Sequence, residues 1–216
     1  AQIILGIPGS WENKSDLVQA VAARGEGWLL VGSTLHHAEK ERSFQVEITD
    51  YELDLQEAYY HASRGMLPNT ILDHIEQHTF TVYVIAEVND LQGMEGAVNA
   101  GAALFQAGGL AVKIETSGLA YSKEEWYSLN EELDHFSLYS YFVNLVRDEE
   151  RYYSSGMQVF GLPDVIVPSS LSPEAATDLL NNFNVYHLDE NPSLQNGDKF
   201  SQEEPATATE YTLSFI

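Results

Sequence analysis

Two opposite charges lie two residues apart in an otherwise apolar run of the sequence. In LAVKIE (110–115), Lys113 and Glu115 alternate with apolar residues, so a strand would place both charges on one face. A lysine and a carboxylate that share a face can move a proton or hold a small polar ligand. They can equally form a structural ion pair, because buried charges are costly unless they are paired.

A second polar strand face contributes further candidate residues. In SFQVEI (43–48), Glu47 shares a face with Gln45, while the apolar residues point the other way. If this face meets the face of Lys113, Glu47 becomes a second ion-pair partner or part of the floor of a site. The candidate ligand-binding residues are therefore Lys113, Glu115, Ser117, Asp164 and Glu47.

Two other segments invite functional interpretations that their spacing does not support. GIPGSWENKS (6–15) follows a strand and opens a helix, but Asn13 stands where a phosphate-binding loop requires glycine before Lys14. HIEQH (74–78) places His74 and His78 on one helical face without the adjacent glutamate of zinc proteases. We interpret the first as a structural turn and the second as solvated helix-end histidines, and we expect no metal and no cofactor.

The composition limits the classes of function. The 216 residues include 33 Asp and Glu but only 10 Lys and Arg, a formal net charge of -23, so we expect no binding to nucleic acids or anionic membranes. Such a surface is either only solubilising or an acidic face for a basic protein partner. The chain has no cysteine, which favours a cytoplasmic location and excludes disulfides and thiol catalysis. No apolar run approaches the ~20 residues that span a bilayer, and no signal peptide is recognisable.

Hydrophobic periodicity predicts the elements that would position these residues. In the first half, we expect strands at 2–7, 28–32, 43–48 and 79–87, and helices at 13–24, 52–64 and 69–78. A linking helix follows at about 91–107. Later we expect strands at 110–115, 137–146, 152–162 and 211–216, a helix from Ser172 to about Asp189, and a loop at 191–209.

The helix that follows the charged strand has a strong start signal. Thr116, Ser117 and Gly118 form a turn, and Ser122 with Glu125 three residues later is a capping box. Tyr121 and Trp126 have the spacing of a hydrophobic staple. The segment around Lys113 is therefore explained largely as a strand–turn–helix connection.

The element order is β-α-β-β-α-β twice. Each half has the order of a ferredoxin-like unit, so we predict an α+β fold in one domain, residues 1–216, with pseudo-halves at about 1–87 and 110–216 joined by the linking helix. The alternative is an open α/β sheet.

Three motifs, IPGSW, GGLAVKIETSGLA with a following tryptophan, and YYSSGMQVFGLPD, together resemble a family of uncharacterised bacterial proteins, a domain of unknown function. The resemblance extends from about Ile4 to Phe200. It implies a bacterial intracellular protein with one continuous domain, and it supplies no activity. Family members often have histidine where this chain has Tyr121 and Gln158. The positions that match the family are Gly9, Trp11, Lys113, Glu115, Ser117, Gly118, Gly156, Met157, Gly161, Pro163 and Asp164.

The acidic surface and the lack of a complete catalytic set predict a non-catalytic protein that binds a partner with a basic surface. The alternative is a small-molecule enzyme or ligand-binding protein with a polar site at Lys113 and Glu115.

Overall fold

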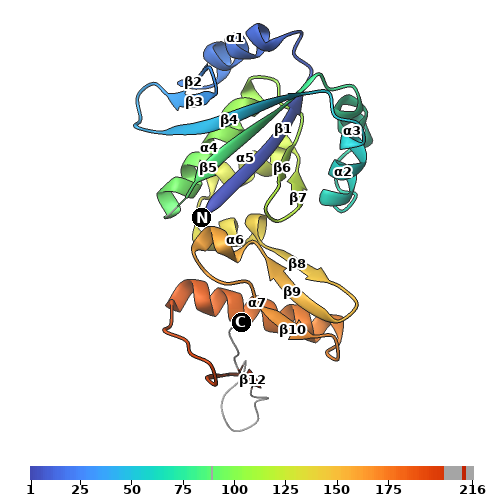
Figure 1. Ribbon diagram of the computed structural model, residues 1–216, viewed down its shortest axis with the longest axis vertical. Helices are drawn as coiled ribbons and strands as arrows, with labels where there is room; N and C mark the ends of the chain where they lie inside the picture. The colour runs from blue at the N-terminus through green and yellow to red at the C-terminus, as the bar shows by residue number, and fades with distance from the viewer. Residues whose placement is uncertain (89, 202–210, 213–216) are drawn as a thin grey trace.

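The protein has an α+β fold, which confirms the fold class predicted from the sequence. A computed structural model describes residues 1–88, 90–201 and 211–212. Within these residues, seven strands form one antiparallel sheet, which occupies the upper half of Figure 1. In spatial order they are β2 (Trp28–Val31), β3 (Thr34–His37), β4 (Ser43–Asp50), β5 (Phe80–Glu87), β1 (Gln2–Gly9), β6 (Val112–Ile114) and β7 (Leu119–Tyr121).

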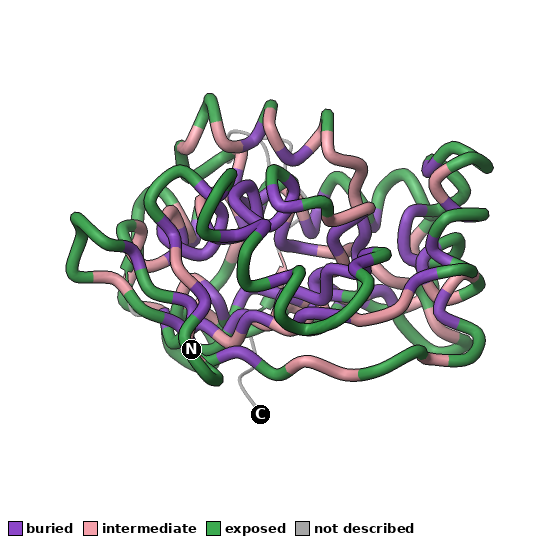
Figure 2. Tube along the Cα trace, turned by 90° about the horizontal axis from the view of Figure 1, so that it is seen from above, coloured by how far each residue is buried: buried purple, intermediate pink, exposed green. Residues whose placement is uncertain are grey.

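The main hydrophobic core lies on one side of this sheet. Alternating side chains such as Leu5, Val46 and Val84 are buried on this side. Trp126 completes the core, and its indole N–H donates to the Val98 carbonyl at 3.0 Å. Figure 2 shows the buried segments gathered in the interior and the exposed ones on the outer turns. The helices on this side are α1 (Lys14–Arg24), α4 (Leu91–Gln106), which lies against the sheet, and α5 (Lys123–Glu131), which packs on α4.

The opposite face of the sheet is only partly covered. The helices α2 (Leu55–Ala62) and α3 (Asn69–Glu76) lie toward the side of β6 and β7, where Tyr59 packs with Ala111 and Ala120. The side chain of Tyr59 in α2 reaches Gly6 of β1, but the two helices themselves lie to the side of β4, β5 and β1, whose surface faces the viewer in Figure 1. We call this surface the open sheet face and define it by the outward residues of these strands and of β6: Gln2, Ile4, Gln45, Glu47, Tyr83, Ile85, Glu87 and Lys113.

A smaller C-terminal module follows the main sheet and forms the lower half of Figure 1. Its elements are α6 (His135–Phe142), β8 (Asn144–Arg147), β9 (Arg151–Ser155), the 3-10 helix η1 (Met157–Phe160), β10 (Ile166–Pro168), α7 (Pro173–Glu190), β11 (Lys199–Phe200) and β12 (Tyr211–Thr212). The first three strands pair antiparallel in the order β10-β9-β8, and the long helix α7 packs on them. Phe142 of α6 belongs to the main core, whereas Tyr139 of the same helix packs toward α7.

The arrangement into two ferredoxin-like halves is wrong, although the α+β class is right. β6 and β7, expected in the second half, join the first sheet beside β1, and β8, β9 and β10 form a sheet of their own. The expected strand 137–146 is largely α6, because Asp134 caps a helix by accepting from the Ser137 N–H at 2.7 Å. The expected strand 152–162 stops at Ser155, because Gly156 has φ 128° and leads into η1. Of the expected strand 211–216, only Tyr211–Thr212 lies within the described residues.

Candidate functional site

The strand register brings the two predicted polar faces onto one surface. Glu47 of β4 pairs with Tyr83 of β5, Tyr83 pairs with Gly6 of β1, and Gly6 pairs with Lys113 of β6. These four residues therefore form one row across the sheet. Three strand spacings of about 4.8 Å separate Glu47 from Lys113, roughly 14 Å in all. Glu47 and Lys113 share the face, as the sequence suggested, but they are too far apart to form an ion pair.

Lys113 forms its ion pair with Glu115, the neighbour two residues along the chain. The distance from Lys113 Nζ to Glu115 Oε2 is 2.7 Å, and the two side chains are 21% and 28% exposed. The pair lies at the border between the open sheet face and the part covered by α2, because Tyr59 of α2 lies beside it. The positive charge on β6 is thus already neutralised in the folded chain.

A glycine makes room for this pair. A Cβ atom on Gly6 would lie 2.9 Å from Glu115 Oε1 and 3.0 Å from a ring carbon of Tyr83. The hydroxyl of Tyr59, which is fully buried, donates to the Gly6 carbonyl at 2.6 Å. Close packing over the Gly6 backbone therefore depends on the missing side chain.

Glu52 extends the polar cluster toward α2. Its carboxylate accepts from the hydroxyl of Tyr83 at 3.1 Å and from Thr49 Oγ1 at 3.0 Å. Its backbone N–H donates to His78 Nε2 at 3.1 Å, and Nδ1 of the same ring contacts the Ile75 carbonyl at 2.7 Å. The open sheet face therefore carries carboxylates on both sides of Tyr83, with Glu52 on one side and Glu115 on the other.

The two tyrosines in this cluster are neutral hydrogen-bond donors. Burial raises the pKa of Tyr59 well above its ordinary value, and the carboxylate of Glu115 raises it further. Burial, together with the charge and the hydrogen bond of Glu52, raises the pKa of Tyr83 in the same direction. Both hydroxyls stay protonated at neutral pH and do not serve as phenolate bases or nucleophiles.

The remaining candidate residues lie elsewhere. Ser117 is in the turn between β6 and β7, where its carbonyl accepts from Asn144 Nδ2 at 3.1 Å. Asp164 is in the C-terminal module, where its carboxylate accepts from the Met157 N–H at 2.9 Å. The structure thus brings Lys113 and Glu115 together, places Glu47 on the same face, and keeps Ser117 and Asp164 in other surroundings.

The two segments with weak motifs have structural roles. Asn13 is the N-cap of α1, and its side chain accepts from the Asp16 N–H at 3.0 Å. His78 is 3% exposed, so the expectation that it is solvated was wrong, whereas His74 is exposed. Both ring nitrogens of His78 have partners, the Glu52 N–H and the Ile75 carbonyl. Among the described residues, no group of three or more histidines and carboxylates is arranged to hold a metal ion.

Sequence reasoning missed Tyr59, Tyr83, Glu52 and Gly6. One local signal was available, since Tyr83 alternates with buried valines in β5 and so had to point to the opposite face. The positions of Tyr59 and Glu52 follow only from the packing of α2 against the sheet. That packing brings together residues more than 50 positions apart in the chain.

Comparison with known proteins identifies one relationship, and it covers only the end of the chain. Residues 153–216 match a family described as a domain of unknown function, DUF4261. The motif GMQVFGLPD (156–164) lies within the matched residues, and the other two motifs of the predicted resemblance lie before them. No curated protein and no solved structure matches the chain. In the described part, no helix is long and apolar enough to span a bilayer.

Proposed function

We propose that this is a non-catalytic bacterial cytoplasmic protein whose open sheet face binds a protein partner with a basic surface. The observation that carries the proposal is the pattern of this face. The partly buried side chains of Ile4, Tyr83 and Ile85 lie side by side at its centre, and the exposed carboxylates of Glu47 and Glu87 flank them. An apolar centre with a polar rim is the usual construction of a protein interface.

The charges on this face favour a basic partner. Lys113 is the one cation among the residues that define the face, and Glu115 neutralises it at 2.7 Å. The nearby carboxylates of Glu47, Glu52 and Glu87 take part in none of the ion pairs found between described residues, although Glu52 accepts from Tyr83 and Glu87 from Gln2. Each can therefore still meet a lysine or arginine side chain of a partner. Such complementarity speeds association and selects partners, and it weakens as salt screens the charges. The absence of cysteine supports the proposed location in a reducing compartment.

A small-molecule site at Lys113 and Glu115 is the alternative proposal. It has less support, because a ligand would have to open an ion pair whose two charges already neutralise each other. The neutral hydroxyls of Tyr59 and Tyr83 add hydrogen-bond donors to this cluster but no base.

The proposal is tested with two double variants that remove the same amount of charge. Glu47→Gln with Glu87→Gln changes the open sheet face, and Glu149→Gln with Glu190→Gln changes exposed positions in the C-terminal module. Each protein is immobilised, incubated with a bacterial lysate at low salt, and its captured proteins are quantified by mass spectrometry. Because both variants lose two negative charges, nonspecific electrostatic capture falls equally in both.

We expect one or more basic proteins to bind the unchanged chain and the module variant, and to lose about tenfold or more in capture by the face variant. Hydrogen exchange of the purified pair should then show protection in β4, β5 and β1. If capture by the two variants falls in parallel for every basic protein, the open sheet face is not the binding surface and the proposal is wrong.

A further inference from the structure

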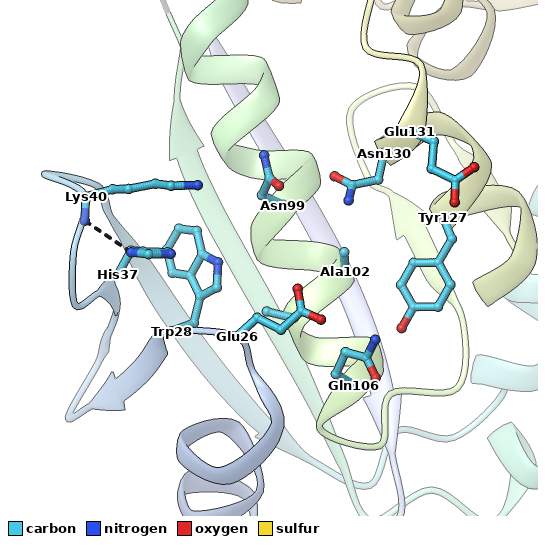
Figure 3. A pocket seen from close by; sticks show the side chains of 11 residues that line it. Glu26, Trp28, His37, Lys40, Asn99, Ala102, Gln106, Tyr127, Asn130 and Glu131 are labelled. Atoms are coloured by element: carbon cyan, nitrogen blue, oxygen red, sulfur yellow. Dashed lines mark hydrogen bonds between the residues drawn. The ribbon is translucent and has the colours of Figure 1, made fainter.

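A separate polar pocket lies on the other side of the sheet. It lies between the β2–β3 hairpin, α4 and α5, and has a volume of about 330 Å³ (Figure 3). We call it the hairpin pocket and define it by six of the residues that line it: Glu26, Trp28, Lys40, Tyr127, Asn130 and Glu131. None of these residues belongs to the open sheet face, so this pocket is independent of the function proposed above.

The hairpin wall of the pocket is held in place by buried rings. Trp28 is 3% exposed, stacks on Phe44 at 5.7 Å between ring centroids, and meets the edge of His37 at 5.2 Å. His37 Nδ1 accepts from the backbone N–H groups of Glu39 and Lys40, each at 3.1 Å. These bonds fix the start of the Lys40 side chain, which extends across the pocket toward α4 in Figure 3.

The opposite wall contains two polar atoms without partners. Tyr127 Oη and Asn130 Oδ1, both on α5, are buried, and neither has a hydrogen-bond partner among the described residues. Leaving such atoms unsatisfied destabilises a fold, so native proteins nearly always provide a partner. Tyr127 and Asn130 are among the residues that line the pocket, so a bound molecule with N–H groups that enters beside them is a candidate for the missing partner.

The hydroxyl of Tyr127 is a neutral group that can donate and accept. Burial raises its pKa, and the nearby carboxylates of Glu26 and Glu124 raise it further. Its ring meets Phe105 edge-on at 6.1 Å between ring centroids, and the Lys123 ammonium lies 5.5 Å from its centroid. These contacts help to position the tyrosine at the pocket wall.

Charges of both signs line the pocket. The ammonium group of Lys40 takes part in none of the ion pairs found between described residues, and the same holds for the carboxylates of Glu26 and Glu131. Figure 3 shows Lys40 at the upper part of the pocket beside Asn99, and Glu26 at the lower part near Gln106. A matching ligand has a negative group at one end and a positive group with N–H donors at the other.

We propose that the hairpin pocket binds a free amino acid, with its carboxylate at Lys40 and its ammonium group directed to Glu26 and Tyr127. The volume of about 330 Å³ is at the lower end of the range for small-molecule sites, which suits a ligand of this size. No covalent step is involved, so the site is a binding site and not a catalytic one.

The test measures the binding of the twenty standard L-amino acids, one at a time at about 5 mM, by thermal shift and then by calorimetry. We expect at least one to raise the Tm by a few degrees. The N-acetyl and C-amide derivatives of that amino acid each lack one charge and should bind about tenfold more weakly. Glycine betaine keeps both charges but has no N–H group, so it should not bind.

Variants separate a specific site from general effects. Tyr127→Phe, Glu26→Gln and Lys40→Gln should each weaken binding about tenfold, whereas Lys14→Gln, at an exposed site outside the pocket, should not. Tyr127→Phe also removes an unpartnered buried hydroxyl, so the free protein should keep or gain thermal stability while binding is lost. The proposal is overturned if no amino acid shifts the Tm, if betaine binds equally well, or if the pocket variants and Lys14→Gln behave alike.

Discussion

Lys113 lies in β6 and Glu115 just after the end of this strand at Ile114, where the Glu115 N–H still donates to the Ile4 carbonyl, so the two side chains remain on the same side of the backbone and form their ion pair. Their environment adds to the attraction, since Tyr59 and α2 exclude water from one side of the pair. The pair remains partly exposed, so its net contribution to stability is that of a partly screened ion pair and not that of a buried one.

A double-mutant cycle measures this contribution. We expect Lys113→Met, Glu115→Gln and the double variant to give a coupling free energy of about 1 kcal/mol in urea unfolding, decreasing as salt is added. The matched control is the exposed pair of Arg151 and Asp148, with Arg151→Met and Asp148→Asn, for which the coupling should be smaller. A coupling no larger than that of the control would mean that Lys113 and Glu115 are free to engage a ligand instead.

The residues of the open sheet face show what sequence alone could predict. The alternation in SFQVEI and LAVKIE correctly placed Glu47 and Lys113 on polar strand faces, because alternation is a local property of a strand. Glu115, expected in the strand 110–115, follows the end of β6 at Ile114. That these faces form one surface depends on the register of β5 and β1 between them. Register is a long-range property. The alternation pattern therefore could not predict that the two faces form one surface, or that Glu47 and Lys113 lie roughly 14 Å apart on it.

At the scale of the element, local capping signals were the most informative. The capping box of Ser122 and Glu125 is present, and Tyr121 lies 6.4 Å from Trp126 between ring centroids, as the staple requires. The short strands β3 and β7 were missed, since three or four residues carry too little periodicity to be recognised. A strand was expected where α6 lies, because an apolar run of this length is compatible with either a strand or a helix.

Helix α7 carries a histidine that should make stability depend on pH. His187 is 6% exposed, its Nδ1 is buried without a hydrogen-bond partner among the described residues, and this desolvation lowers its pKa from the ordinary 6.5. The unfolded chain therefore binds a proton more readily than the folded one. The stability that neutral His187 contributes is present above about pH 6.5 and is lost as the pH falls below it.

The measurement is the free energy of unfolding in urea between about pH 7.5 and 5, for the unchanged chain, His187→Gln and His74→Gln. As the pH falls from about 7.5 to 5, the free energy of unfolding of the unchanged chain should decrease more than that of His187→Gln. The difference should be up to about 1.4 kcal/mol for each unit by which folding lowers the pKa of His187. The other titratable groups that line the recess beside His187 are His135 and Asp90. The His74→Gln variant, at an exposed site, serves as control and should keep the pH dependence of the unchanged chain. If His187→Gln keeps it as well, His135, Asp90 or other groups cause the pH dependence and His187 does not.

At the scale of the whole molecule, charge is the dominant property. The chain has a net charge of -23, with 33 carboxylates and only 10 Lys and Arg, and three side-chain ion pairs are found between described residues, one of them involving a histidine. With so few cations, carboxylates repel one another, and this repulsion opposes the compact state. The two-module arrangement leaves these charges on the surfaces of both the main sheet and the C-terminal module.

Salt should therefore stabilise this protein, which is the reverse of what is expected for one held together by surface ion pairs. Raising NaCl from about 0.02 to 0.3 M shortens the screening length to below 10 Å, so repulsion between neighbouring carboxylates falls and the Tm should rise by several degrees. Choline chloride at equal ionic strength should act alike, since screening does not depend on which monovalent cation is added. A Tm that stays constant or falls would mean that attractive contacts such as Lys113–Glu115 outweigh the repulsion, and a rise with sodium alone would indicate a specific cation site.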